Sequence, residues 1–538
     1  MLTLRDHRSG DLFDPWGHLG PQRRRLLEQS WAGVFREHLL NALPVSELAP
    51  YCRDGFGRPS KDLYVALGAL ILQQLHDLTD KQATESIAFN ITWHYALDIR
   101  HEPDACRCER TLRNYRRKIL ELGVDEVMFR TLTDQLIVAV GVDTTKQRLD
   151  STAVRSAIRS LTRLGILVEA NCKFLRELKR KHPNQYASVP SDVIRKYVDR
   201  QGDGCFVDTR PSESKRRLAE AARDIYEVIE QLGLTEASSL ASFQLLVRIF
   251  DEQCEVVTGP DAPVAVRPPR KSDCDGVVNP ADPDARYNKH RGVGYSVQIM
   301  ETYSEDDSPE QDESTVAQPD LITHVSVGKL TMHDQDALEP ALDDVAQRGM
   351  GPQQLLADSH YGSKECLTQG QQRGVEIVSP AMTAKGSRQG KLTLEDFELD
   401  DSGRILRCPE GHAPLETSGG SQKLQVVFPG KDCEVCSRCK DCPASAVGRT
   451  SSRYQYTPAR VRQRERRLRE DTDAFRARYR WRAGIEATMS RFKHQMAMAR
   501  LRVRGMASVT YTALLRALGL NILRVAACRT AGTTRRAL

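Results

Sequence analysis

The first 140 residues place apolar side chains at the spacing of an α-helix. Leucines recur every three or four positions within 62–75, and 79–82 have the Thr-x-x-Gln pattern of a capping box ahead of a helix over 83–89. A basic segment, 110–118, leads into further apolar positions. These patterns predict an all-helical N-terminal domain over 1–140.

The middle of the chain alternates between apolar and polar residues instead. Alternating or short apolar runs predict strands at 294–301, 321–327, 354–358 and 375–378. Another strand is expected to start near 143 and to end near Asp150. Strands interspersed with helical segments predict an α/β fold.

Between these strands lie segments of different character. Helical spacing returns over 155–250, a Cys-rich stretch with short strands follows near 404–442, and 459–498 is an Arg-rich helical region. We therefore expect an α/β core formed by 141–154, 265–400 and 455–528, interrupted by a helical insertion (155–264) and a Cys-rich β insert (401–454).

The Arg-rich helical region has two stripes. Its polar stripe is Tyr479, Arg482, Glu486 and Lys493, which an unbroken helix would hold within about 60° of one another. Its apolar stripe, about 80° away, is Ile485, Met489, Phe492 and Met496. The pattern favours one face packed on a core and one facing a cleft. A solvated face of intrahelical ion pairs is the alternative.

Two further acids lie at predicted strand ends. Asp150 ends the strand near 143–150, and Asp358 ends the strand at 354–358. Side chains at such ends point into the usual ligand crevice of an α/β sheet. Together with Glu486 they supply the carboxylate oxygens that Mg²⁺ prefers, and two such ions would suit phosphodiester chemistry. Each Asp alone is more often a cap or turn residue. His360 could approach this site or be an ordinary surface histidine.

The C-terminal end of the chain differs from the rest in its charge. The 538 residues carry a net charge of +6, but from 451 onward 21 Lys and Arg face 5 Asp and Glu. Such a block favours a polyanionic partner, most simply nucleic acid, although a solvated basic helix is also consistent. The basic helix 110–118 after two short helices fits a helix-turn-helix DNA-binding motif, or a plain bundle.

The N-terminal residues, the longest apolar stretch and the cysteines indicate where in the cell the protein is expected. The N-terminal residues lack an apolar signal core, and charged residues interrupt the longest apolar stretch, 509–528. We expect a cytoplasmic protein with no membrane contact, whose fourteen Cys are thiols or metal ligands before disulfides.

The Cys-rich stretch is a candidate metal site. Cys433, Cys436, Cys439 and Cys442 are spaced by two residues, and Cys408 lies upstream. Four of these five thiols would satisfy a structural Zn²⁺. Unligated thiols are the main alternative and an iron–sulfur cluster the less favoured one, because the last gap is one residue shorter than in the ferredoxin pattern.

These motifs together resemble a known family. The Tyr479-x2-Arg482-x3-Glu486-x6-Lys493 spacing fits the Tyr-(2)-Arg-(3)-Glu-(6)-Lys signature of bacterial insertion-sequence DDE transposases. Asp150-Ser-Thr and the stretch 356–362 resemble the first and second Asp motifs of that family, and 57–117 is similar to its helical N-terminal domain.

The resemblance implies an RNase H-like core in which Asp150, Asp358 and Glu486 hold two Mg²⁺ or Mn²⁺ ions. Tyr479, Arg482 and Lys493 would contact DNA near the cleaved end. The partners would be double-stranded element ends and target DNA, bound by a homodimer in the bacterial cytoplasm and nucleoid. The function would be metal-dependent cleavage at the element ends followed by strand transfer.

Two other functions remain open from the sequence. A transposase-derived regulator could bind the same DNA without cutting, although the three carboxylates argue against it. A metalloenzyme unrelated to DNA is the other, and the basic C-terminal block argues against that.

Overall fold

The structure is a computed structural model. It describes residues 5, 7, 14–51, 62–199, 211–257, 264–268, 275–305, 318–382, 390–420, 422–447 and 450–537. Residues 57–61, where the resemblance of the N-terminal segment begins, lie outside these ranges.

The N-terminal region is helical, as predicted. Its helices are α1 (Gly20–Gln29), α2 (Trp31–Val34), α3 (Leu63–Leu75), α4 (Asp80–Phe89), α5 (Ile91–Leu97), α6 (Glu102–Ala105), α7 (Glu109–Leu122) and α8 (Val124–Val140). The capping box is confirmed at the start of α4. The Thr79 hydroxyl accepts a hydrogen bond from the Gln82 backbone N–H, and the Gln82 side-chain oxygen accepts one from the Thr79 backbone N–H.

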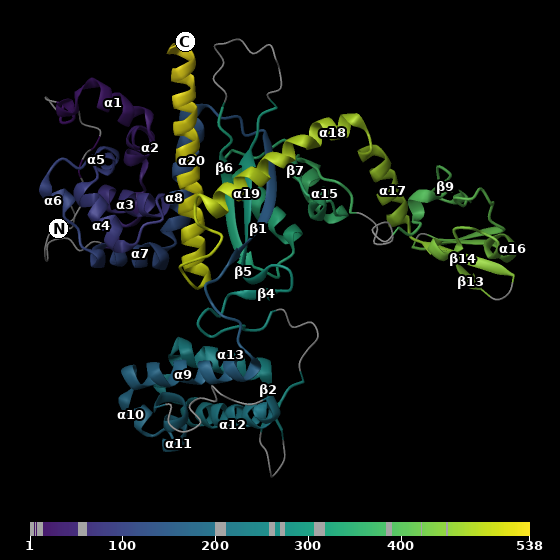
Figure 1. Cartoon of the computed structure of the whole chain (residues 1–538), viewed down its shortest axis with the longest axis horizontal. Coiled ribbons are helices and arrows are strands. Elements are labelled where there is room, and N and C mark those ends of the chain that lie inside the picture. Colours follow the sequence, from purple (N-terminus) through teal and green to yellow (C-terminus); the bar gives the residue numbers. More distant parts are fainter. Residues whose placement is uncertain are drawn as a thin grey trace.

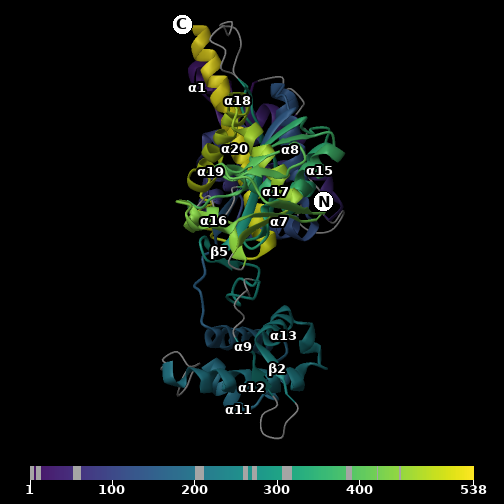
Figure 2. The same ribbon diagram turned by 90° about the vertical axis from the view of Figure 1, so that its right-hand side faces the viewer.

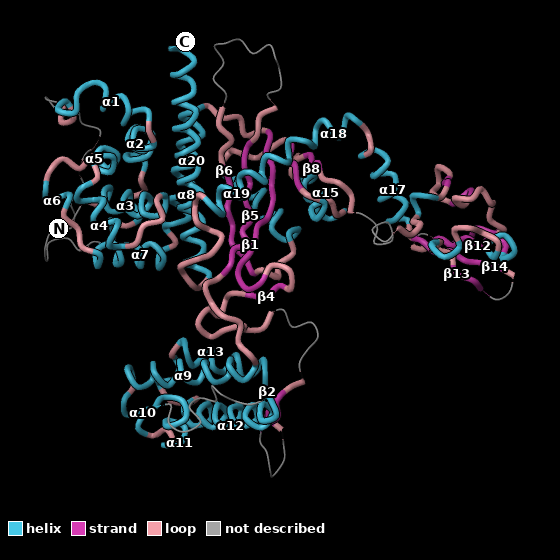
Figure 3. The backbone as a smooth tube through the Cα atoms, viewed as in Figure 1, coloured by secondary structure: helices cyan, strands magenta, loops and turns pink. Residues whose placement is uncertain are grey.

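A mixed β-sheet forms the centre of the molecule (Figure 3). Its strands are β1 (Lys146–Arg155), β4 (Arg286–Asn288), β5 (Gly292–Thr302), β6 (Ile322–Lys329), β7 (Gln354–Ala357) and β8 (Glu376–Val378). The strand order is β6-β5-β1-β7-β8, with β4 pairing to the start of β5. Strand β5 is antiparallel to both β1 and β6, whereas β7 and β8 run parallel to β1. The α/β prediction is confirmed at this level.

The first strand is longer than the sequence indicates. The expected end near Asp150 is wrong, because β1 continues to Arg155 and stays paired with β5 as far as Gly294. The partner on the other side, β7, pairs only with Lys146–Leu149. Asp150 therefore lies within β1, at the point where its parallel neighbour stops.

Helices connect and cover the sheet. Helix α14 (Leu338–Gln347) joins β6 to β7, and α15 (Lys364–Gln372) joins β7 to β8. Helix α20 (Met506–Ala537) packs against β6 on one side and against α3 and α8 on the other, so it joins the N-terminal helices to the sheet (Figure 1). The Met506–Ala531 stretch is long and apolar enough to cross a membrane, but 72% of its most apolar window is buried inside the structure, as in a core helix.

The Arg-rich segment is not one helix. The helical prediction for 459–498 is confirmed, but the unbroken helix assumed for the polar stripe is wrong: the segment forms α17 (Pro458–Glu470), α18 (Asp473–Tyr479), a 3-10 turn (Arg480–Ala483) and α19 (Gly484–His494). The Thr472 hydroxyl caps α18 by accepting from the Phe475 N–H, and this cap starts a new helix. The apolar stripe is nevertheless buried, at 7% exposure or less.

Two further groups of elements surround separate apolar clusters. The first contains α9 (Arg163–Lys181), α10 (Pro183–Ala187), α11 (Ser191–Ile194), α12 (Ser214–Leu232), α13 (Ala241–Gln253), β2 (Cys254–Val256) and β3 (Val264–Val266). Figure 2 shows this group standing off one end of the sheet. The second contains β9 (Glu398–Leu399), β10 (Ile405–Arg407), β11 (Glu416–Gly419), β12 (Leu424–Pro429), α16 (Gly430–Glu434), β13 (Ser445–Val447) and β14 (Ser451–Tyr456), and lies at the far end of α17.

Candidate functional site

The register of two parallel strands brings the two predicted aspartates together. Leu149 on β1 is the partner of Ala357, the last residue of β7. The next residues along the two strands are Asp150 and Asp358, so they occupy neighbouring positions at the carboxyl end of β7. The Asp358 carboxylate also accepts the His360 backbone N–H, 2.9 Å away, which fixes the turn after β7.

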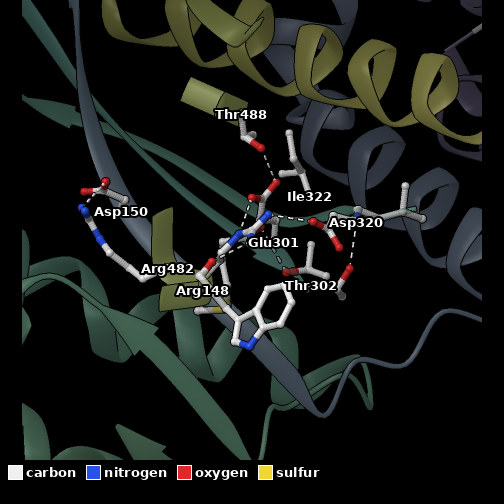
Figure 4. A network of polar contacts seen from close by, with 12 residues as sticks. Arg148, Asp150, Glu301, Thr302, Asp320, Ile322, Arg482 and Thr488 are labelled. Atoms are coloured by element: carbon white, nitrogen blue, oxygen red, sulfur yellow. Dashed lines mark hydrogen bonds and ion pairs between the residues drawn. The ribbon is translucent and has the colours of Figure 1, made fainter. Parts of the chain in front are cut away.

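Arg482 links Asp150 to Glu486. Arg482 Nη2 lies 2.7 Å from Asp150 Oδ2, and Arg482 Nη1 lies 2.9 Å from Glu486 Oε1. Figure 4 shows the Arg482 side chain extended toward Asp150. The Asp150 side chain is 13% exposed and that of Glu486 is 67% exposed, so the bridge runs from the sheet out to solvent.

The surroundings of Asp150 favour its neutral form. Burial is the largest cause of a pKa raised to about 6, and the nearby carboxylates of Asp358 and Asp334 raise it further. Arg482 and the Ser151 backbone N–H oppose this shift. A carboxyl group in this state gains from a bound cation, which would favour its ionised form.

Asp334 is a member of the site that the sequence analysis missed. Ligand atoms of Asp334, Asp358 and His360 all lie within 4.8 Å of one another, and among the described residues they form the group of three that could hold a metal ion. His360 Nδ1 is 3.0 Å from Asp358 Oδ2 and 3.9 Å from Asp334 Oδ2. We call Asp150, Asp334, Asp358 and Glu486 the acidic edge.

No local sequence signal marks Asp334, but the strand order accounts for its position. Both β1 and β6 are antiparallel to β5, so β6 runs in the same direction as β1 and ends at the same edge of the sheet. Asp334 follows the end of β6 by five residues. An acid shortly after the predicted strand at 321–327 was therefore a candidate once the strand order was known.

Two buried side chains orient Asp334. The Gln298 amide donates to Asp334 Oδ1 over 3.1 Å, and the Tyr361 hydroxyl donates to the Gln298 carbonyl over 2.7 Å. Gln298 and Tyr361 are both fully buried. The Asp334 carboxylate is thus held facing Asp358 from inside the sheet.

The remaining members of the polar stripe approach the same edge from different elements. Tyr479 ends α18 and donates to the Ala357 carbonyl oxygen, 3.1 Å away, beside Asp358. Lys493 is half-buried on α19, where burial lowers its pKa and the cations Arg291 and Arg155 lower it further. Arg482 lies in the 3-10 turn and Glu486 in the first turn of α19.

The five candidate zinc ligands line one cavity. A cavity of about 130 Å³ is bordered by Cys408, Cys433, Cys436, Cys439 and Cys442, together with His412. Burial raises the pKa of Cys433 and of Cys442, and the neighbouring thiols add to both shifts. Among the described residues these sulfurs do not form a group of three within 4.8 Å of one another. We call this the cysteine cavity.

Comparison with protein families gives two matches. A family described as "Transposase DDE domain" matches residues 407–526, and one described as "Transposase domain (DUF772)" matches residues 27–118. Both segments are therefore similar to transposase domains. The first covers the five cysteines of the cavity and Glu486 but begins after Asp150 and Asp358, and the second covers the end of α1, α2 to α6 and most of α7. No curated protein and no solved structure matches the chain.

Proposed function

We propose that the protein is a DDE transposase that cleaves DNA at the ends of an insertion sequence and joins the freed ends to target DNA. The observation that carries this is the register that sets Asp150 beside Asp358 while Arg482 connects Asp150 to Glu486. The strand order, with an antiparallel second strand and parallel fourth and fifth strands, supports an RNase H-like core.

The donor set at the acidic edge fits divalent cations. Asp150, Asp358 and Glu486 offer hard oxygen ligands, and burial together with the neighbouring carboxylates raises the pKa of Asp150, an effect that a bound cation would offset. A pair of Mg²⁺ or Mn²⁺ ions bound there would supply charge stabilisation for the attacking and leaving oxygens of a phosphodiester. Asp334 lies close enough to contribute to the same site.

Two successive displacements follow from this chemistry. Water attacks the phosphorus at the element end, a P–O bond breaks, and a 3′-hydroxyl leaves. That hydroxyl then attacks a phosphodiester of the target, forming the new P–O bond and releasing the target's own 3′-hydroxyl. Arg482, Lys493 and Tyr479 contact the DNA next to the cleaved bond. A phosphate that draws Arg482 away also frees Asp150 and Glu486 for cations.

The rest of the chain serves DNA binding and assembly in this proposal. Helix α7 exposes Arg110, Arg113 and Arg117, whose spacing places them on one helical face for contact with an element end. The proposed domains are 1–140 for DNA binding, the split α/β core for catalysis, and 155–264 and 401–454 as insertions. Two chains acting on paired ends form a homodimer on DNA.

The cysteine cavity is proposed to hold a structural zinc ion. Four of its thiols, or three with His412, would form the tetrahedral set. Burial, with a smaller effect of the neighbouring thiols, raises the pKa values of Cys433 and Cys442, and a bound dication would favour their thiolate forms. Protein purified without chelator should then contain zinc, and its absence on metal analysis would remove this part of the proposal.

An excision assay tests the proposed activity. A marker is flanked by DNA from both sides of the native locus, and the protein is supplied in trans with Mg²⁺. Excision by wild type but not by Glu486→Gln supports the proposal. Tight, salt-dependent binding to the flanks without excision would indicate a non-cutting regulator, and excision by the variant would remove Glu486 from the site.

A further inference from the structure

A buried network of charged side chains lies behind the acidic edge (Figure 4). Arg148 on β1 is the cross-strand partner of Glu301 on β5, and its Nε lies 2.7 Å from Glu301 Oε1. The two side chains are 6% and 0% exposed. Arg148 precedes Asp150 by two residues, so both project from the same face of β1.

The Arg148 guanidinium uses all three of its nitrogens. Besides Glu301, it donates through Nη1 to the Trp481 carbonyl oxygen over 2.8 Å and through Nη2 to Asp320 Oδ2 over 2.7 Å. Trp481 immediately precedes Arg482 in the 3-10 turn. The contact therefore anchors the backbone one residue before the arginine that holds Asp150 and Glu486.

The second Glu301 oxygen reaches the next helix. The Thr488 hydroxyl on α19 donates to Glu301 Oε2 over 2.7 Å, and Arg524 on α20 donates to the same oxygen over 2.9 Å. Arg524 also contacts the Thr488 hydroxyl. Thr488 is 1% exposed and lies two residues after Glu486. Glu301 thus ties the first half of α19 to both the sheet and α20.

The start of α19 lies directly on this network. A β-carbon at Gly484 would overlap the Arg148 guanidinium, so the helix begins against it at a residue without a side chain. Two cations, Arg148 and Arg524, balance the two anions Glu301 and Asp320. Burying such a set gains little stability over an apolar core, whereas its directional bonds define one arrangement of the groups.

We propose that Arg148, Glu301 and Thr488 are positioning residues that fix α19 on the sheet and so hold Glu486 and Arg482 opposite Asp150. None of the three is placed to touch the reacting phosphate; they act through the 3-10 turn and the helix. This role in catalysis rests on the proposed function, whereas the anchoring of α19 can be measured without it.

Conservative substitutions separate positioning from general stability. Thr488→Val removes the hydroxyl at nearly constant volume, and Thr488→Ser retains it. Arg148→Lys keeps the charge but replaces the planar fork, whose three nitrogens reach three separate acceptors, with a single ammonium nitrogen. Its matched control is Arg286→Lys, since Arg286 is 2% exposed in the same sheet and donates to the Pro283 and Ala285 carbonyls instead. Each full-length variant is examined by amide hydrogen exchange over 484–494 and by DNA cleavage.

The expected result is a local effect. Thr488→Val and Arg148→Lys speed exchange within α19 and lower kcat for cleavage by about 10- to 100-fold, as for an active group displaced by less than about 1 Å, with DNA affinity unchanged. Thr488→Ser and Arg286→Lys behave as wild type in α19. Unchanged exchange in α19 for the first pair, or equal loss of protection across the whole sheet, overturns the proposal. A wild type without cleavage would end the proposed function, while the exchange data still decide the anchoring.

Discussion

The acidic edge and the cysteine cavity both gather metal-ligating side chains, but they are built in opposite ways. The acidic edge draws Asp150, Asp334, Asp358 and Glu486 from positions more than 300 residues apart. Every thiol of the cysteine cavity comes from the 35 residues between Cys408 and Cys442. The sheet positions the first set through strand register and a buried ion network, whereas short strands and turns position the second.

The difference also shows in the charge of the two sites. At the acidic edge the single positive charge of Arg482 is shared between the carboxylates of Asp150 and Glu486, and burial raises the pKa of Asp150 to about 6. In the cysteine cavity the five thiols line one space, and burial raises the pKa values of Cys433 and Cys442. We propose an exchangeable catalytic site at the edge and a structural site in the insert, and the following substitutions test this difference.

The largest expected effect is on cleavage. Asp358→Asn should lower the rate of Mg²⁺-dependent cleavage by at least about 10³-fold, because losing several kcal/mol of charge stabilisation corresponds to such a factor. DNA affinity should change little, as a gel-shift titration would show. The matched control is Asp336→Asn, an exposed acid outside the metal-binding group. Equal loss in both variants would contradict the account.

The second effect is on zinc and stability. Cys433→Ser should lower the zinc content measured by mass spectrometry and unfold the insert, since a structural zinc contributes folding free energy directly. Limited proteolysis would detect new cleavage within 401–454. Cys366→Ser, a buried thiol in α15 away from the cavity, is the control. Zinc retained in full by the Cys433 variant would show that this thiol is not a ligand.

A third effect concerns pH. Cation binding needs an ionised Asp150, so Mn²⁺ affinity should fall as the pH drops through about 6. The Asp334 carboxylate raises the pKa of Asp150. In Asp334→Asn the loss of Mn²⁺ affinity should therefore begin at a lower pH than in the wild type. Calorimetric titration of Mn²⁺ between pH 5 and pH 8 measures both. An unchanged pH dependence of Mn²⁺ affinity in this variant would mean that Asp334 does not raise the pKa of Asp150.

The smallest effect is on DNA affinity. Lys493→Ala should weaken binding to end DNA and reduce the slope of log affinity against log salt by about 1, the value for one lost phosphate contact. The control is Lys215→Ala, an exposed lysine on α12 in the helical group away from the sheet. An unchanged slope for Lys493→Ala would assign that residue to packing alone.

Local patterns predicted local structure well. The capping box of α4, the strands β5 to β8 and the buried stripe of α19 follow from side-chain periodicity and cap chemistry, which act over a few residues. The break between α17 and α19 was missed because Thr472 and the 3-10 turn interrupt a segment whose composition is uniformly helical.

Long-range placement was harder to predict. The end of β1 depends on its pairing with β5, some 140 residues away, and the role of Asp334 depends on the direction of β6. Neither pairing can be recognised from the residues close to it in the sequence. Asp358 was identifiable because it follows a short apolar run, and Asp150 because Asp150-Ser-Thr resembles a family motif, whereas Asp334 lies in a turn with no such pattern.

The most direct test is to determine whether the catalytic cation binds at the acidic edge. Mn²⁺ binding would be followed by electron paramagnetic resonance in wild type, in Asp150→Asn/Asp358→Asn and in Cys433→Ser/Cys436→Ser. The account predicts that the first double variant loses Mn²⁺ binding and that the second keeps it. Retention of Mn²⁺ by the aspartate variant, with loss in the cysteine variant, would contradict the assignment of the catalytic cation to the acidic edge.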